Sequence, residues 1–241
     1  MLSVGLRSAF APANAAGGAA LGGGDADARN MFLSSKFIGS MVVENATEGY
    51  NTCLFAYGQT GSGKSFSMMG SGSGDNRGVI PRICQELFEK AESERLRQEG
   101  NTNCKIEVSY LEIYQEKVRD LLNPSGNSNL RVREHASTGP YVEGLSNHAV
   151  EDFVDIEVLM EEGNKLRTVQ STKMNDVSSR SHAIFQITFT QVTIVTDGDS
   201  VTRTERCSKI SLVDLAGSER SGQINGKSKE RLREGNYINK S

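Results

Sequence analysis

The sequence has no apolar run long enough to cross a membrane, and only four of its 241 residues are cysteines. A membrane-spanning helix needs about 20 consecutive apolar residues, so we expect no direct insertion into a membrane. The cysteines lie far apart and lack the close spacing of a zinc site; they are Cys53, Cys84, Cys104 and Cys207. This usage favours a reduced, cytoplasmic protein whose thiols are small core residues.

An excess of charge of either sign is also lacking, since 27 basic residues face 30 acidic ones. No overall positive field indicates nucleic acid, and we expect no nucleic-acid partner. The balance is uneven along the chain, because residues 220–241 contain six basic and two acidic residues, a net charge of +4. This basic segment suggests an acidic partner surface, although a solvated helix face explains it equally well.

Residues 1–28 are rich in alanine and glycine, with runs at 15–20 and 22–24. Such a segment buries too little apolar surface to offset the entropy lost on ordering, so we expect a disordered arm. It has neither the apolar core of a signal peptide nor the features of a convincing transit peptide.

From residue 29 onward, segments with strand alternation and segments with helical spacing follow one another. Strands are predicted at 52–57, 106–110, 183–195 and 207–215. Helices are predicted over 37–49, from Pro81 onward, and from Phe153 to about Gly163. Residues 197–199 form a plausible hairpin tip. No internal repeat is present, and strands mixed with helices predict an α/β protein with a three-layer α/β/α arrangement.

The most specific motif is a glycine, four residues and then Gly-Lys-Ser, directly after the apolar strand at 52–57. It consists of Gly58, Gln59, Thr60, Gly61, Ser62, Gly63, Lys64 and Ser65. In a phosphate loop the glycines allow a tight turn whose N–H groups face phosphate oxygens, while Lys64 reaches the β- and γ-phosphates and the Ser65 hydroxyl ligates Mg²⁺. The alternative is a chance glycine-rich turn, which the preceding strand and the Lys-Ser pair disfavour.

Two further elements fit a phosphate site. Asp214 ends the apolar strand at 207–215, where an acid beside a phosphate loop can hold Mg²⁺ through water, and Gly217 can offer its N–H to a γ-phosphate. The hydroxyl-rich segment 175–182 can donate to phosphate oxygens, complete the metal shell and place a water. Taken alone, that segment is better explained as a capping cluster before the next strand, and only its presence together with the other two elements favours the phosphate-site role.

Together these motifs resemble the kinesin motor domain. The resemblance rests on the loop at 58–65 with 49–51 and 55–57 before it, and on 175–182, 214–220 and 238–241, and it extends from about Met31 to Ser241. The segments 77–84, 130–135 and 139–145 look most like the third kinesin family, whose members carry vesicles and organelles. The resemblance implies a P-loop NTPase fold of kinesin type with a mixed, mainly parallel central sheet.

The same resemblance implies residue roles. The loop would bind the nucleotide phosphates, with Asn175 also on the nucleotide side. The first switch would contain Ser178, Ser179 and Arg180, with Ser178 near the lytic water and Ser179 near the metal and γ-phosphate. The second switch would contain Asp214, Gly217 and Glu219. Ser65, Ser179 and Asp214 would surround Mg²⁺, and an Arg180–Glu219 ion pair would close the site. No residue resembles a strong general base, so catalysis would rest on positioning and charge stabilisation.

The implied function is that of an ATP-hydrolysing, microtubule-stimulated motor. Its cofactors would be ATP and Mg²⁺, its track the microtubule, and its direction the plus end. Cargo or adaptors would bind regions outside this chain, and a coiled coil is possible there. The expected location is the cytoplasm and its microtubule cytoskeleton.

The chain departs from the family at both ends. The Arg-x-Arg-Pro strand beside the adenine is not found before Met31, and the sequence stops at Ser241, early in the helix that meets the microtubule. We therefore interpret 29–241 as a partial motor domain with a sheet incomplete at both sequence ends. A catalytically silent nucleotide- or partner-binding module is the alternative. A GTPase is disfavoured because no guanine-reading Asn-Lys-x-Asp motif occurs, and a phosphate-loop kinase because no acceptor site or lid arginines are evident.

Overall fold

A computed structural model describes residues 2–7, 38–70, 74–98, 101–126, 129–136, 139–173, 180–197 and 200–218. Its strands are β1 (Leu2–Arg7), β2 (Thr52–Tyr57), β3 (Thr102–Tyr114), β4 (Lys117–Asp120), β5 (Arg131–His135), β6 (Gly139–Glu143), β7 (His148–Val150), β8 (His182–Asp197) and β9 (Ser200–Asp214). Its helices are α2 (Lys64–Met69), the short 3₁₀ turn η1 (Gly74–Asn76), α3 (Val79–Arg97) and α4 (Phe153–Lys173), and residues 38–47 are also helical.

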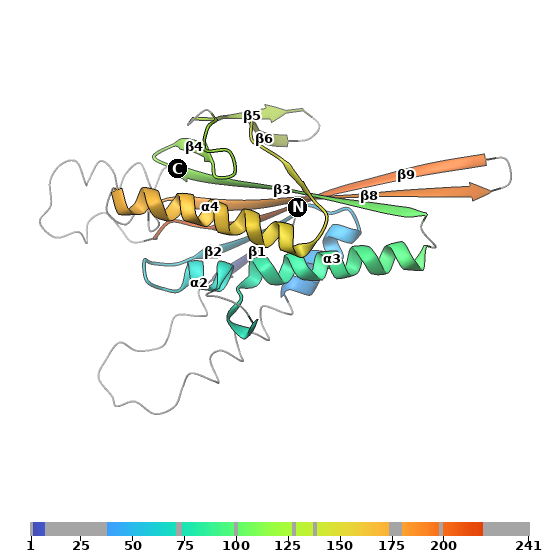
Figure 1. The fold of residues 1–241 in the computed structure, drawn as a ribbon, viewed down its shortest axis with the longest axis horizontal. Coiled ribbons are helices and arrows are strands. Elements are labelled where there is room, and N and C mark those ends of the chain that lie inside the picture. The colour runs from blue at the N-terminus through green and yellow to red at the C-terminus, as the bar shows by residue number, and fades with distance from the viewer. Residues whose placement is uncertain are drawn as a thin grey trace, which may run out of the picture.

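Within these residues a seven-stranded sheet runs in the order β1-β2-β9-β8-β3-β4, with β7 also paired to β3 (Figure 1). The strands β5 and β6 form a separate two-stranded sheet. The mixed α/β sheet is confirmed, but the expectation that it is mainly parallel is wrong for the described strands. Only β1–β2 and β2–β9 are parallel pairs. The tight connection between β8 and β9 forces an antiparallel pair, and β3 then adds antiparallel to β8.

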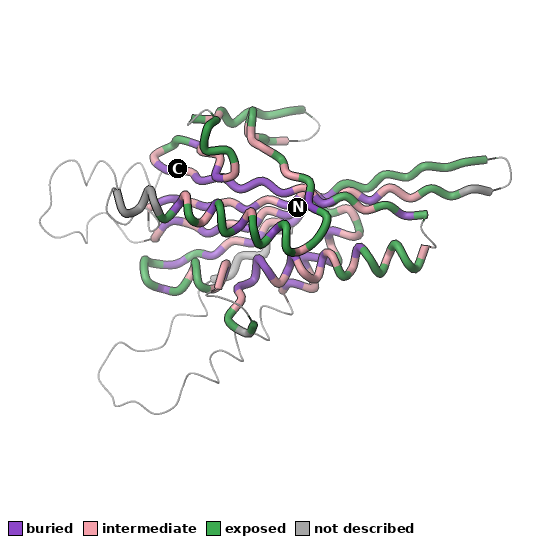
Figure 2. The backbone as a smooth tube through the Cα atoms, in the orientation of Figure 1, coloured by how far each residue is buried: buried purple, intermediate pink, exposed green. Residues whose placement is uncertain are grey.

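The described helices pack against one face of this sheet. Figure 2 shows the buried positions concentrated along the sheet strands and the inner sides of α3 and α4, with exposed positions on the outer sides. Alternate residues of β8, such as Phe185 and Ile187, are fully buried on the helix side, whereas Ile184 and Gln186 between them are only half-buried. The described helices thus supply one helical layer of the expected three-layer fold.

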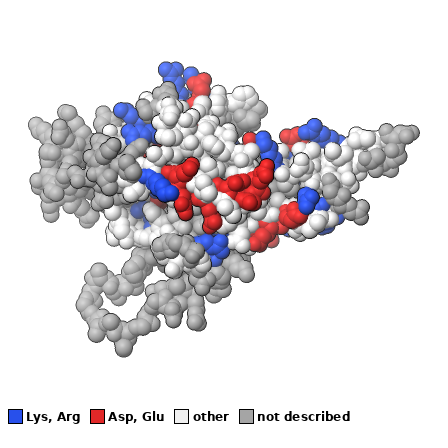
Figure 3. All heavy atoms as spheres, viewed as in Figure 1, with Lys and Arg blue, Asp and Glu red and all other residues white. Residues whose placement is uncertain are grey.

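Helix α4 packs on the sheet through one face of the helix. Its buried residues are Ile156, Met160, Gly163 and Arg167, which recur at intervals of three and four and therefore share one face. Its outward face is acidic and exposed, at Asp155, Glu157, Glu161 and Glu162. Figure 3 shows acidic side chains gathered on this side of the molecule. No helix among the described residues is long and apolar enough to cross a membrane.

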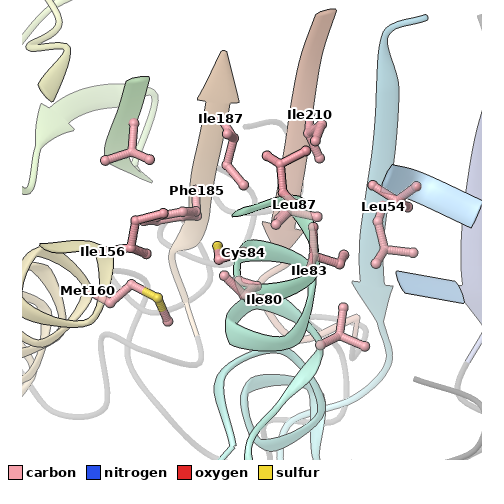
Figure 4. Packing of buried hydrophobic residues seen from close by; sticks show 14 of the residues in the cluster. Leu54, Ile80, Ile83, Cys84, Leu87, Ile156, Met160, Phe185, Ile187 and Ile210 are labelled. Atoms are coloured by element: carbon pink, nitrogen blue, oxygen red, sulfur yellow. The ribbon is translucent and has the colours of Figure 1, made fainter. Parts of the chain in front are cut away.

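The core lies between these helices and the sheet. Figure 4 shows Ile83, Cys84 and Leu87 of α3 directed toward the strands that carry Leu54 and Ile210, and Ile156 and Met160 of α4 beside Phe185. Tyr110 meets Phe185 edge to face, with ring centroids 5.5 Å apart. The four cysteines are free thiols, as expected, but only Cys84 is fully buried.

Three local expectations differ from the structure. The strand β1 pairs with β2 in the segment where a disordered arm was expected; residues 2–7 contain the alternating Leu2, Val4 and Leu6, and the alanine- and glycine-rich sequence begins after them. Residues 8–28 lie outside the described residues. Helix α3 begins two residues before Pro81, and α4 continues ten residues beyond Gly163.

Gly163 does not end α4 because it serves packing. A Cβ at this position would collide with the ring of Tyr110, which is itself buried against Phe185. We expect Gly163→Ala to lower the free energy of unfolding by about 1–3 kcal/mol through overpacking, although alanine is intrinsically the better helix former by about 1 kcal/mol. Urea denaturation measures this change.

Gly39→Ala is the matched control for that substitution. Gly39 also lies in a helical segment, but its added Cβ would meet the nearest atoms, from Glu86 and Ile83, at 3.4 and 3.6 Å, which are ordinary contacts. It should be neutral or stabilising. Equal effects of the two substitutions would show that the Tyr110 ring yields and that the packing argument is wrong.

Candidate functional site

The glycine-rich loop occupies residues 58–63, between the end of β2 and the start of α2. Gly61 and Gly63 have φ angles of 78° and 85°, in the left-handed region that glycine adopts without a steric penalty. A Cβ at either would meet no atom within 4 Å, so the backbone conformation, and not space, requires glycine there. The loop therefore has the turn that the sequence motif predicts, although α2 after it is only six residues long.

Lys64 closes the loop from its C-terminal side. Its Nζ donates to the carbonyl oxygens of Gly58 and Gln59, each at 2.9 Å. These contacts hold the ammonium group across the loop, where its charge can meet an anion bound by the loop N–H groups.

Asp214 lies beside the loop because β9 pairs in parallel with β2, with Ala56 opposite Asp214. The carboxyl ends of two neighbouring parallel strands meet at one edge of the sheet, which is where ligands bind in such sheets. The Ser65 Oγ donates to Asp214 Oδ2 at 2.6 Å, and the Ser218 N–H donates to the Gly58 carbonyl at 3.0 Å. The structure thus brings the loop and the strand-end acid together; their roles toward a metal stay predictions.

Ser65 and Asp214 fit Mg²⁺ better than a transition metal. Asp214 Oδ1 is buried and has no hydrogen-bond partner among the described residues, which leaves an acceptor for a metal-bound water. No group of three or more His, Cys, Asp or Glu side chains converges among those residues. Mg²⁺ commonly binds through one or two protein oxygens, waters and substrate phosphates, so one carboxylate and one hydroxyl are a suitable donor set.

Behind Asp214 lies a buried cluster of charges that the sequence did not reveal. Arg167 of α4 donates from Nη1 to Asp214 Oδ2 at 3.0 Å, and its Nε lies 3.8 Å from Glu112 Oε1 of β3. The side chains of Arg167, Glu112 and Asp214 are 8%, 0% and 4% exposed. Burial alone would lower the pKa of the Arg167 guanidinium, but the neighbouring charges, chiefly that of Asp214, outweigh it and raise this pKa.

A signal for this cluster was present in the chain. Arg167 occupies a position on the inward stripe of α4, and Glu112 lies between Leu111 and Ile113 in a strand that is apolar around it. A charged residue on a buried stripe usually has a partner. Which partner it has depends on how α4 docks on β3, and the sequence does not state that.

The structure describes only some of the remaining predicted site residues. Asn175, Ser178, Ser179 and Glu219 lie outside the described residues, so the switch contacts and the Arg180–Glu219 pair stay predictions. Arg180 is half-buried just before β8, and Gly217 is half-buried three residues after Asp214. The N–H of Ala216 donates to His182 Nδ1 at 3.1 Å, which ties the segment after β9 to the start of β8.

Tyr110 adjoins this cluster and provides a pH test of its burial. Its hydroxyl donates to Asn164 Oδ1 at 2.9 Å. Burial raises the pKa of Tyr110 from 10.0 to about 12, and the charge of Arg167 lowers it by less. Between these two pH values the folded protein keeps a proton that the unfolded chain has lost, so the free energy of unfolding falls as pH rises from 10 to about 12.

Tyr110→Phe should remove this part of the pH dependence. At neutral pH the variant loses about 1 kcal/mol with the hydrogen bond, and the difference from the original chain should shrink as pH rises through this window. Urea denaturation at a series of pH values measures both curves. Parallel curves would mean that the Tyr110 hydroxyl ionises in the folded protein as it does in the unfolded one.

Comparison with known proteins gives consistent matches. The family model "Kinesin motor domain" matches residues 25–241. The human kinesin-like protein KIF13B is 54% identical over 207 residues, which is 86% of this chain and 11% of that protein. The chain thus spans about a tenth of the length of this curated relative.

Solved structures agree with the sequence matches. A structure described as that of a fast kinesin has a TM-score of 0.72 at 42% identity, covering 83% of this chain and 54% of the other. The KIF14 dimer with AMP-PNP in complex with a microtubule has a TM-score of 0.69 at 43% identity, covering 86% and 56%. These likenesses confirm the expected α/β fold of kinesin type.

Proposed function

Because this chain belongs to the kinesin motor-domain family, we propose that it forms the nucleotide-binding part of an ATP-hydrolysing, microtubule-based motor. The observation that carries the proposal is the contact between Ser65 of the glycine-rich loop and Asp214 at the end of the neighbouring strand. It places a hydroxyl, a carboxylate and the Lys64 ammonium around one loop, which is the arrangement that phosphoryl transfer requires.

Each of these groups has a role in the proposal. The N–H groups of the loop at 58–65 would hold the phosphate chain. The ammonium of Lys64, which donates to the carbonyls of Gly58 and Gln59 in the structure, would donate to the β- and γ-phosphates. Ser65 and Asp214 would hold Mg²⁺, which would neutralise charge on the transferring phosphoryl group. Gly217 offers its N–H to the γ-phosphate. Asn175, Ser178, Ser179, Arg180 and Glu219 complete the switches around a lytic water.

The partner of the whole protein is, in this proposal, the microtubule. Membership of the kinesin family and the likeness to KIF14, which was solved in complex with a microtubule, support this partner. KIF13B is a member of the third kinesin family, which supports plus-end movement of cargo through regions beyond this chain, and a location on cytoplasmic microtubules.

The test is ATP turnover with and without microtubules. It should be run on the 241-residue chain and on a form extended at both ends with the flanking segments of a kinesin motor domain. We expect microtubules to stimulate the extended form, and Lys64→Ala to abolish that stimulation. No turnover by either form would contradict the proposed motor activity and leave the silent-module alternative.

A further inference from the structure

We propose that Arg167, supported by Glu112, is a positioning residue that fixes the Asp214 carboxylate for the magnesium–nucleotide site. This inference rests on the proposed function, because it concerns the same site. It assigns a role to two residues, on α4 and β3, that belong neither to the glycine-rich loop nor to the two switch segments.

The geometry shows how the carboxylate is fixed. Asp214 Oδ2 accepts two hydrogen bonds, one from Arg167 Nη1 at 3.0 Å and one from Ser65 Oγ at 2.6 Å. The other oxygen, Oδ1, has no such partner among the described residues. Arg167 and Ser65 together therefore hold Oδ2 and leave Oδ1 for a metal-bound water. A residue that orients a metal ligand in this way typically changes metal affinity by about 10–100-fold when it is removed.

Arg167 is in turn held from two sides. Its Nε faces Glu112 Oε1 at 3.8 Å, and its Nη2 donates to the Ser181 carbonyl at 3.5 Å. The contact with Glu112 is an ion pair and not a hydrogen bond, so it supplies an opposite charge from β3. The orientation of the guanidinium is set by its hydrogen bonds to Asp214 and to the Ser181 carbonyl. A lysine at this position could place one charge near Asp214 but could not reproduce the planar fork.

The charge count of the cluster points in the same direction. One buried guanidinium faces two buried carboxylates, those of Glu112 and Asp214, so the cluster behind the loop contains one carboxylate more than it has arginines. A buried ion cluster is weak evidence of stabilisation, because apolar replacements of similar size are often as stable. The Asp214 carboxylate beside Ser65 is, however, a charge that a cation at that place would meet.

The experiment follows release of a fluorescent ADP analogue from the 241-residue chain, once with Mg²⁺ and once with EDTA. The variants are Arg167→Gln, Arg167→Lys and the control Lys165→Gln, which removes an exposed charge two residues away on the same helix. We expect Mg²⁺ to slow release from the original chain and the control equally. Arg167→Gln should lose about tenfold or more of this slowing, with release in EDTA unchanged. Arg167→Lys should lie between.

A purely structural role predicts something else, namely that release in EDTA and in Mg²⁺ accelerates by the same factor. Equal acceleration in EDTA and in Mg²⁺ would overturn the inference. An unchanged effect of Mg²⁺ on Arg167→Gln would overturn it as well. So would slower release from Arg167→Gln, which would mean that the arginine charge repels the metal. If the original chain binds no nucleotide, the proposed function fails together with it. If the original chain responds to Mg²⁺ and Arg167→Gln responds equally, only the inference fails.

A second variant covers the case in which Arg167→Gln does not fold. Arg167→Met combined with Glu112→Leu replaces the guanidinium and the carboxylate behind it with apolar side chains, so one buried carboxylate loses its arginine, where Arg167→Gln leaves two. Asp214 then keeps only its contact with Ser65. This double variant should show the same loss of the Mg²⁺ effect, and a full Mg²⁺ effect in it would contradict the positioning role.

Discussion

Replacing Lys64 with alanine should lower the affinity of the chain for ATP and ADP by about 100-fold. The ammonium is held across the loop by two carbonyl oxygens at 2.9 Å, and bound phosphates would replace them with two charge-assisted hydrogen bonds. Each such bond contributes about 1.5–3 kcal/mol, and about 1.4 kcal/mol corresponds to a tenfold change in the dissociation constant. Equilibrium binding of a fluorescent nucleotide measures the loss.

The stability of the chain should change little in this variant, because Lys64 is only half-buried and its two contacts are local. Lys165→Ala, which removes an exposed lysine of α4, is the matched control and should bind nucleotide normally. Normal binding by Lys64→Ala would mean that the loop does not hold the phosphates. Equal losses in both variants would point to net charge instead of a specific site.

Replacing Asp214 with asparagine should have the second large effect. It should slow the hydrolysis of Mg-ATP but leave the affinity for nucleotide in the absence of metal unchanged. Asparagine keeps the shape of the side chain and a carbonyl oxygen for the Ser65 hydroxyl, but it removes the negative charge. Arg167 then retains Glu112 as its counter-charge at 3.8 Å, so the fold should persist. We expect turnover of Mg-ATP to fall by about 10–100-fold, measured as phosphate release at saturating nucleotide.

Asp120→Asn is the control for that substitution. Asp120 also lies at the end of a strand, but its carboxylate accepts hydrogen bonds from the backbone N–H groups of Leu122 and Ser146, at 2.9 and 2.8 Å, and it does not contact the loop. Turnover should survive this change. If Asp214→Asn reduced nucleotide binding in EDTA as strongly as in Mg²⁺, the carboxylate would be supporting the loop and not a metal.

The sequence predicted those parts of the site that depend on local pattern. A strand, a glycine-rich turn and a Lys-Ser pair are contiguous, so residues 58–65 could be read directly. The sequence also placed Asp214 at the end of a strand, and the structure brings it to the loop because β9 pairs in parallel with β2, so that their carboxyl ends meet at one edge. Ser65 and Asp214 are 149 positions apart in the chain, and the parallel pairing of β2 and β9 brings them into contact.

The parts that escaped prediction depend on how elements dock. The Arg167–Glu112 contact exists only because α4 packs across β3, which no local pattern encodes. Gly163 looked like a helix stop, but the ring of Tyr110 uses the space that a side chain would fill. The sheet proved more antiparallel than expected, because the long hairpin of β8 and β9 sets the direction of β3 as well.

We expect this chain to recognise the phosphates of a Mg²⁺-bound nucleotide through residues 58–65 and Asp214. Calorimetric titration of ATP, ADP and adenosine into the chain in the presence of Mg²⁺ tests it most directly. Saturable binding of ATP and ADP at one site per chain is predicted, with adenosine bound at least about 100-fold more weakly. Adenosine binding as tightly as ATP, or no saturable binding of ATP, would contradict the claim.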